Sequence, residues 1–142
     1  MSLTSKATSN WTGDLESGSG RVTLDSSKSA EFPVNWKART EEQGGTTNPE
    51  ELLGAAHAAC YTMAFSKALK DAGHDPQSVQ ATAAVTFDLA KGGVVGSHLT
   101  VNGTVPGISE DDFQRIADDA KRNCPVSKAL AGIEITLDAT LS

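Results

Sequence analysis

The sequence predicts an α+β fold, with mostly antiparallel sheet wrapped around one long helix. Three observations lead to this prediction: strand-like segments on both sides of the middle of the chain, one long apolar helix between them, and a shorter amphipathic helix before the last strand. The expected order is β-β-β-α-β-β-α-β. A chain of 142 residues is the size of one ordinary domain, so residues 1–142 are expected to fold as a single domain with a core of its own.

The first third of the chain is expected to form three strands, at residues 6–11, 20–26 and 31–40. Each is a short run bounded by turn-forming residues, as is typical of strands. The glycine- and serine-rich segment GDLESGSG separates the first two strands, and EEQGG follows the third.

The central helix has the clearest start signal in the sequence. In TTNPEELL, Asn48 suits the N-cap, Pro49 suits the first helical position, and the two following acids favour the positive end of the helix dipole. The helix should run to about Ala72, where Gly73 can adopt the left-handed C-cap conformation. It is apolar nearly all round through Phe65, which predicts a buried, central helix.

The last part of the chain is expected to form a hairpin, a second helix and a final strand. Ser109 suits the N-cap of the second helix, and Pro125 should end it because the residue before a proline avoids helical geometry. The other expected elements are strands at 78–89, 94–105 and 133–141 and a short helical turn at 126–132.

Charge and hydropathy exclude several classes of function. The chain has 12 Lys and Arg against 18 Asp and Glu, a formal net charge of −6, which argues against nucleic acid or an anionic membrane as the main partner. The N-terminal segment MSLTSKATSN has no apolar core of a signal peptide. The longest apolar stretch, residues 52–65, is shorter than the roughly 20 residues that span a bilayer. We therefore expect a cytoplasmic protein.

The chain has two cysteines, Cys60 and Cys124. In a reducing cytosol a cysteine pair is more often catalytic, redox-active or metal-binding than a structural disulfide. A nucleophilic and a resolving thiol are the minimum for a two-cysteine redox cycle. Either cysteine alone could instead be a small buried hydrophobe, and the spacing does not show that the two meet.

His57 precedes Cys60 by three residues on the same helical face, which permits a Cys–His hydrolase as a rival function. A packed, hydrogen-bonded helix histidine is the commoner outcome. His57, His74 and His98 are scattered and have none of the paired spacings of zinc ligands, so no metal site is expected. A small-molecule-binding domain without catalysis is a further alternative.

Arg39 and Glu50 flank the turn before the central helix. Either could be an ordinary surface charge. As partners near a cysteine they could activate the thiol, because a guanidinium stabilises a thiolate and a carboxylate can hold the guanidinium in place. Trp11 and Trp36 are expected to pack on the sheet rather than to form a substrate pocket.

Three segments closely resemble the OsmC/Ohr family of osmotically inducible and organic hydroperoxide resistance proteins: TNPEELLGAAHAAC (47–60), NCPVSKAL (123–130) and EITLDATL (134–141). This resemblance implies a thiol-dependent peroxidase that reduces organic hydroperoxides and, in the OsmC branch, hydrogen peroxide. It also implies an intertwined homodimer with cysteines at the interface, no metal, haem or flavin cofactor, and a dithiol reductant, dihydrolipoyl groups on a carrier protein.

By this resemblance, Cys60 is the peroxidatic cysteine, Cys124 the resolving cysteine, and Glu50 the acid that orients a catalytic arginine. The OsmC branch has that arginine on the third strand, where WKART provides Arg39. The early loop that provides the arginine in Ohr proteins is replaced here by LESGSGRV, in which Arg21 does not align. The histidine of GAAHAAC also points to the OsmC branch.

Ten helical residues separate Glu50 from Cys60, a rise of roughly 15 Å. If the helix is continuous, Glu50 cannot reach the thiol of its own chain. A working cluster would then take the acid, and with it the arginine, from the second subunit.

Overall fold

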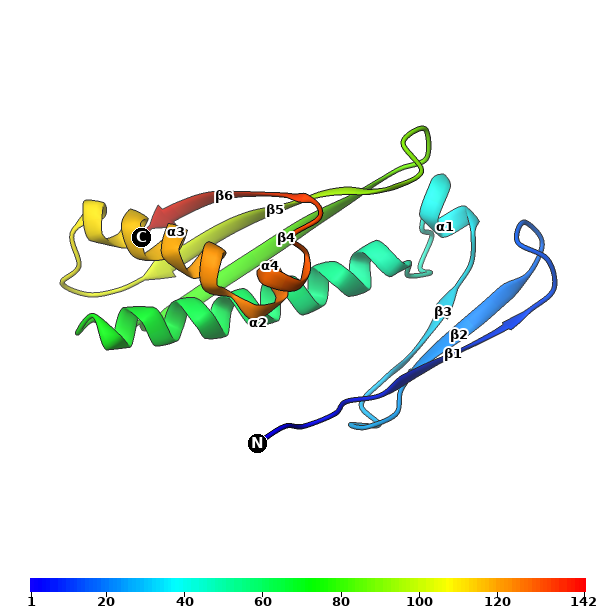
Figure 1. Cartoon of the computed structure of the whole chain (residues 1–142), viewed down its shortest axis with the longest axis horizontal. Coiled ribbons are helices and arrows are strands. Elements are labelled where there is room, and N and C mark those ends of the chain that lie inside the picture. Colours follow the sequence, from blue (N-terminus) through cyan, green and yellow to red (C-terminus); the bar gives the residue numbers. More distant parts are fainter. The chain divides into compact units, whose positions relative to one another are not determined.

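The structure is a computed structural model that describes all 142 residues, and it confirms the α+β class. The chain divides into two compact units, Met1–Leu52 and Leu53–Ser142. Each has its own three-stranded sheet (Figure 1). The single domain expected over residues 1–142 stays a prediction.

The first unit contains an antiparallel sheet in the order β1-β2-β3. The strands are β1 (Ala7–Thr12), β2 (Ser19–Leu24) and β3 (Glu31–Val34). Trp11 pairs with Gly20 across β1 and β2. A Cβ atom at Gly20 would lie 2.8 Å from the Trp11 ring, so the glycine lets this indole lie flat on the sheet.

The third strand is shorter than predicted. It ends at Val34, and a short helix, α1 (Lys37–Thr40), carries Arg39, so the prediction of a strand through residue 40 is wrong at its end. The cause is local. The Asn35 side chain accepts a hydrogen bond of 2.7 Å from the backbone N–H of Ala38. This hydrogen bond favours a helical turn over continued β-sheet pairing of the backbone.

Helix α2 (Pro49–Asp71) begins and ends as predicted. The Asn48 side chain accepts a 2.8 Å hydrogen bond from the backbone N–H of Glu51, and Gly73 has a φ of +88°. Within one chain only one face of α2 is buried, along His57, Tyr61, Phe65 and Leu69. The opposite face is exposed and carries small or apolar residues, among them Ala55, Ala59 and Met63, with two lysines, Lys67 and Lys70, toward the end of the helix.

The second unit contains a sheet in the order β4-β5-β6. Strands β4 (Ser78–Asp88) and β5 (Gly93–Thr104) form the predicted antiparallel hairpin, whereas β6 (Glu134–Leu141) pairs parallel to β5. A parallel neighbour requires a crossover connection. Helices α3 (Glu110–Asn123) and α4 (Pro125–Ala129) form it. Ser109 caps α3 as predicted, accepting a hydrogen bond from the N–H of Asp112.

The core of the second unit lies between the sheet and the helices α2 and α3, which pack on the same face (Figure 1). Phe65 of α2 meets Phe113 of α3 edge to face, with ring centroids 5.4 Å apart. Helix α2 comes close to β4 at Gly54, where a Cβ atom would lie 2.9 Å from the carbonyl oxygen of Ala83. None of the helices, the 23-residue α2 included, has the length and hydropathy of a membrane-spanning segment.

Candidate active site

The second unit brings the two cysteines together, although 64 positions separate them in the sequence. Cys60 lies in the middle of α2, and Cys124 lies between α3 and α4. Cys124 is fully buried and Cys60 is half-buried, and both are free thiols. The two thiols interact directly, and this interaction raises the pKa of Cys60 and lowers the pKa of Cys124. The two sulfur atoms that a two-cysteine redox cycle requires therefore already lie next to each other.

The surroundings of the two thiols differ. Burial raises the pKa of Cys60, opposed only by a hydrogen bond from the backbone of Val126. Burial also raises the pKa of Cys124, but interactions of its sulfur with the backbone of Ser127, the Cys60 thiol, the Ser127 hydroxyl and the backbone of Val126 together outweigh burial, so the net shift is downward. Within one chain Cys124 is therefore the more readily ionised thiol of the pair.

His57 is fully buried one turn before Cys60 and confirms the expected packed, hydrogen-bonded histidine. Its Nδ1 atom lies 2.7 Å from Ser97 Oγ, and its Nε2 atom lies 2.8 Å from Ser127 Oγ. Burial lowers the pKa of His57, so the imidazole is neutral near neutral pH. Both ring nitrogens are thus occupied by serine hydroxyls rather than by a thiol.

Sequence reasoning missed the two serines. Ser127 was visible only as the last residue of the CPVS motif, and nothing in the sequence marks Ser97. Both are nearly inaccessible to solvent, and a buried hydroxyl almost always has a partner. Their partner is the same imidazole.

The first unit contains the other two predicted site residues and pairs them. Arg39 donates from Nε and Nη2 to Oε1 of Glu50, at 2.9 and 2.8 Å. Helix α1 positions the arginine and the first turn of α2 positions the acid. Only 6% of the Glu50 side chain is exposed, and its Oε2 atom is buried without a hydrogen-bond partner in the chain.

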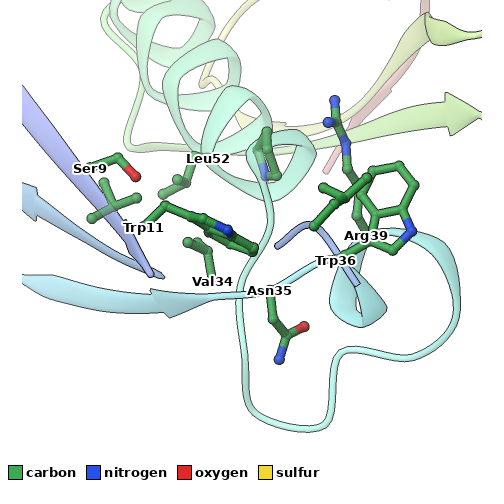
Figure 2. A pocket seen from close by; sticks show the side chains of 10 residues that line it. Ser9, Trp11, Val34, Asn35, Trp36, Arg39 and Leu52 are labelled. Carbon is green, nitrogen blue, oxygen red and sulfur yellow. The ribbon is translucent and has the colours of Figure 1, made fainter. Parts of the chain in front are cut away.

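A largely apolar pocket of about 390 Å³ lies beside this ion pair in the first unit. Figure 2 shows Trp11, Val34 and Leu52 grouped together, with the Trp36 ring beside the Arg39 side chain. Trp11 packs on its sheet as expected, but both tryptophans also line this pocket, which the sequence did not predict. The structure contains no group of three or more His, Cys, Asp or Glu side chains arranged to hold a metal ion.

The sequence matches a known family over most of its length. The family model described as "OsmC-like protein" matches residues 42–138. Peroxiredoxin OsmC of Escherichia coli (strain K12) is 41% identical over 143 residues, which cover 99% of each chain. This chain belongs to the OsmC-like family.

Other relatives of this OsmC family member come from the hydroperoxide resistance branch. Organic hydroperoxide resistance protein-like 2 of Staphylococcus epidermidis is 33% identical over 103 residues, 69% of this chain and 71% of the relative. The crystal structure of an organic hydroperoxide resistance protein from Elizabethkingia anophelis, with crystallant-derived thiocyanate bound, superposes with a TM-score of 0.74 at 27% identity over the whole of both chains. These relatives confirm the predicted family and the predicted peroxidase role.

Proposed function

We propose that this OsmC family member reduces organic hydroperoxides and hydrogen peroxide with Cys60 as the peroxidatic and Cys124 as the resolving cysteine. The observation that carries the proposal is the contact between the two thiols. A pair of cysteines serving only as core residues would not need to face each other sulfur to sulfur.

The cycle has three balanced steps. The Cys60 thiolate attacks one peroxide oxygen, the O–O bond breaks, and alcohol or water leaves after taking a proton, so that Cys60 becomes a sulfenic acid. Cys124 then attacks that sulfur, an S–S bond forms, the S–O bond breaks, and the departing hydroxide takes the Cys124 proton as water. An external dithiol reduces the disulfide and is itself oxidised to a disulfide. No further cofactor is needed.

Arg39 and Glu50 supply what the surroundings of the cysteines lack. Ionising a free thiol completely at pH 7 gains at most about 30-fold, or about 2 kcal/mol. Burial raises the pKa of Cys60, so a cation is needed for the thiolate and for the charge that develops on the peroxide. A guanidinium is suited to both tasks.

We assign this cation to the second subunit of a homodimer. Helix α2 is continuous from Pro49 to Asp71, so Glu50 and Cys60 of one chain differ by a rise of roughly 15 Å. The unpartnered Oε2 of Glu50 needs a donor from outside its chain, since a buried, unpaired oxygen costs about 1–3 kcal/mol. The exposed face of α2 with Ala55, Ala59 and Met63 is a suitable surface for a symmetric dimer contact.

The apolar pocket beside Arg39 suits the alkyl group of an organic hydroperoxide, because it offers apolar contact next to a cation. For the reductant we propose a dithiol of the dihydrolipoyl type on a carrier protein. A reducing cytoplasm, where both thiols stay free between cycles, is the proposed location.

The Cys–His hydrolase is the weaker alternative, because both ring nitrogens of His57 bond to serines. The deciding experiment adds one equivalent of tert-butyl hydroperoxide and counts free thiols, followed by mass spectrometry. Two thiols should be lost in the wild type. Cys60→Ser should be unreactive, and Cys124→Ser should turn over once and carry an oxidised Cys60. Turnover by Cys60→Ser would overturn the proposal, as would retention of both thiols in the wild type.

A further inference from the structure

A buried chain of hydroxyl and imidazole groups leads to the sulfur of Cys124. It runs from Ser97 on β5 through His57 on α2 to Ser127 on α4, over distances of 2.7 and 2.8 Å. The Ser127 hydroxyl then bonds to the sulfur of Cys124. All members are 5% exposed or less. Three elements of the second unit are therefore joined by polar contacts that converge on one thiol.

The number of protons available decides which group donates in each of these hydrogen bonds. A hydroxyl has one proton to donate, and a neutral imidazole has one N–H. When Cys124 is a thiolate its sulfur can only accept, so Ser127 donates to it and the Ser127 oxygen accepts from Nε2–H of His57. Nδ1 is then the acceptor, so Ser97 donates to it. Every donor points toward Cys124, an arrangement that stabilises negative charge at that end.

We propose that Ser127 activates Cys124 for disulfide formation, and that His57 and Ser97 are positioning residues that hold the Ser127 hydroxyl on the sulfur. This rests on the proposed cycle. In the resolving step Cys124 loses its proton and attacks the Cys60 sulfur, and the sulfenic oxygen leaves with that proton as water. The Ser127 hydroxyl stabilises the charge on sulfur while the proton departs.

The same geometry separates the two thiols by role. The hydroxyl of Ser127 bonds to Cys124, and Cys60 receives no side-chain hydroxyl. The chain of hydrogen bonds thus serves the second chemical step and leaves the activation of Cys60 to other groups.

The titration of Cys124 can be measured separately from that of the titratable groups around it. Cys60 and Tyr61 face it from α2, and Asp118 on α3 interacts with Tyr61. Burial raises the pKa of Tyr61 far above the neutral range, and Asp118 and Cys124 add to that rise. In a Cys60→Ser background, Cys124 is the one thiol left in the chain.

The test measures thiolate absorbance against pH in the Cys60→Ser background. Ser127→Ala should move the Cys124 titration upward by about one pH unit, the effect of losing one hydrogen bond to a charged atom. Ser127→Thr keeps the hydroxyl and should leave the titration within a few tenths of a unit. Ser97→Ala, equally buried but two bonds away from the sulfur, should give less than half the shift of Ser127→Ala.

An unmoved titration in Ser127→Ala would overturn the proposal. So would equal shifts in Ser97→Ala and Ser127→Ala, because they would mean a loosened core. With both cysteines present, Ser127→Ala should also prolong the sulfenic acid, trapped with dimedone after one equivalent of peroxide. If wild-type Cys60 forms no sulfenic acid, the proposed function fails, while the titration still decides the role of Ser127.

Discussion

Arg39 contacts Glu50 through a single carboxylate oxygen: Nε and Nη2 both donate to Oε1, at 2.9 and 2.8 Å. The second oxygen, Oε2, is buried and unpartnered within the chain. A bidentate pair would occupy both oxygens. The observed geometry fixes the guanidinium plane and leaves one strong acceptor available for a group from another molecule.

Replacing Arg39 should therefore damage catalysis far more than stability. Arg39→Ala should lower kcat/KM for an organic hydroperoxide by about 100-fold or more, the usual effect of losing one preorganised charge-stabilising donor. Arg39→Lys should also lose most activity, because an ammonium cannot keep both contacts to Oε1. The measurement is steady-state peroxide reduction coupled to dihydrolipoamide.

Arg21 provides the matched control. It forms an Arg–Glu pair with Glu31, but both side chains are half exposed, so the pair contributes little. Arg21→Ala should leave kcat/KM within about twofold of the wild type. A large loss in Arg21→Ala together with a small loss in Arg39→Ala would refute the assignment of Arg39.

Mixed dimers should recover activity if the site is shared. Cys60→Ser and Glu50→Ala homodimers are each expected to be strongly impaired. After they are unfolded and refolded together, a mixed dimer has one site with an intact Cys60 and an intact Glu50 from different chains. Since half of the dimers are then mixed, about a quarter of wild-type activity should return. Native mass spectrometry confirms the heterodimers; if these form without activity, Glu50 acts within its own chain.

Buried His57 should make the fold sensitive to mild acid. Burial lowers its pKa below the unfolded value of 6.5, so the unfolded chain binds the proton more readily. Its contribution is complete above about pH 6.5 and is lost as the pH falls toward the lowered folded pKa. The slope should reach at most about 1.4 kcal/mol per pH unit. Urea unfolding between pH 7.5 and 5.5, at fixed protein concentration, measures it.

Two variants check this assignment. His57→Gln should be less stable than the wild type at pH 7.5, but should lose the part of the slope that comes from the imidazole. His98→Gln removes a more exposed histidine, which bonds to Thr136 and Asp138, and is the comparison variant for loss of a histidine outside the core. An unchanged slope in His57→Gln would show that His57 is not responsible.

Gly54→Ala should destabilise the chain, against the usual rule for helices. Alanine normally stabilises a helix by about 1 kcal/mol relative to glycine. At Gly54 the added Cβ would lie 2.9 Å from the backbone oxygen of Ala83, so α2 and β4 would have to move apart. We expect a net loss of about 1–3 kcal/mol, measured as a lower Tm. Gly132→Ala, where a Cβ meets no atom within 4 Å, should be nearly neutral.

Local signals in the sequence predicted the elements well, because caps and turns depend on neighbouring residues. Asn48 and Ser109 cap their helices as expected. The strand expected to carry Arg39 was wrong because one side chain, Asn35, bonds to the backbone three residues later and favours a helical turn. The parallel pairing of β5 with β6 could not be predicted, since alternating polarity does not encode strand direction.

In the candidate site, too, the sequence predicted the residue types but not the contacts between distant positions. The residue types and the family resemblance pointed to Cys60 and Cys124, yet no spacing rule could tell that the two sulfurs touch. The hydrogen bonds of His57 depend on Ser97 and Ser127, which lie 40 and 70 positions away and come together only in the folded unit.

The contact between Cys60 and Cys124 also bears on which reductants can complete the cycle. A disulfide across 64 positions would close a long loop and stabilise the fold by roughly 4 kcal/mol in the chain-entropy model. By a thermodynamic cycle, folding stabilises that disulfide by the same amount, which lowers its reduction potential by roughly 90 mV relative to the unfolded chain. Glutathione would then reduce it poorly, and only a strongly reducing dithiol would return the thiols for another turnover.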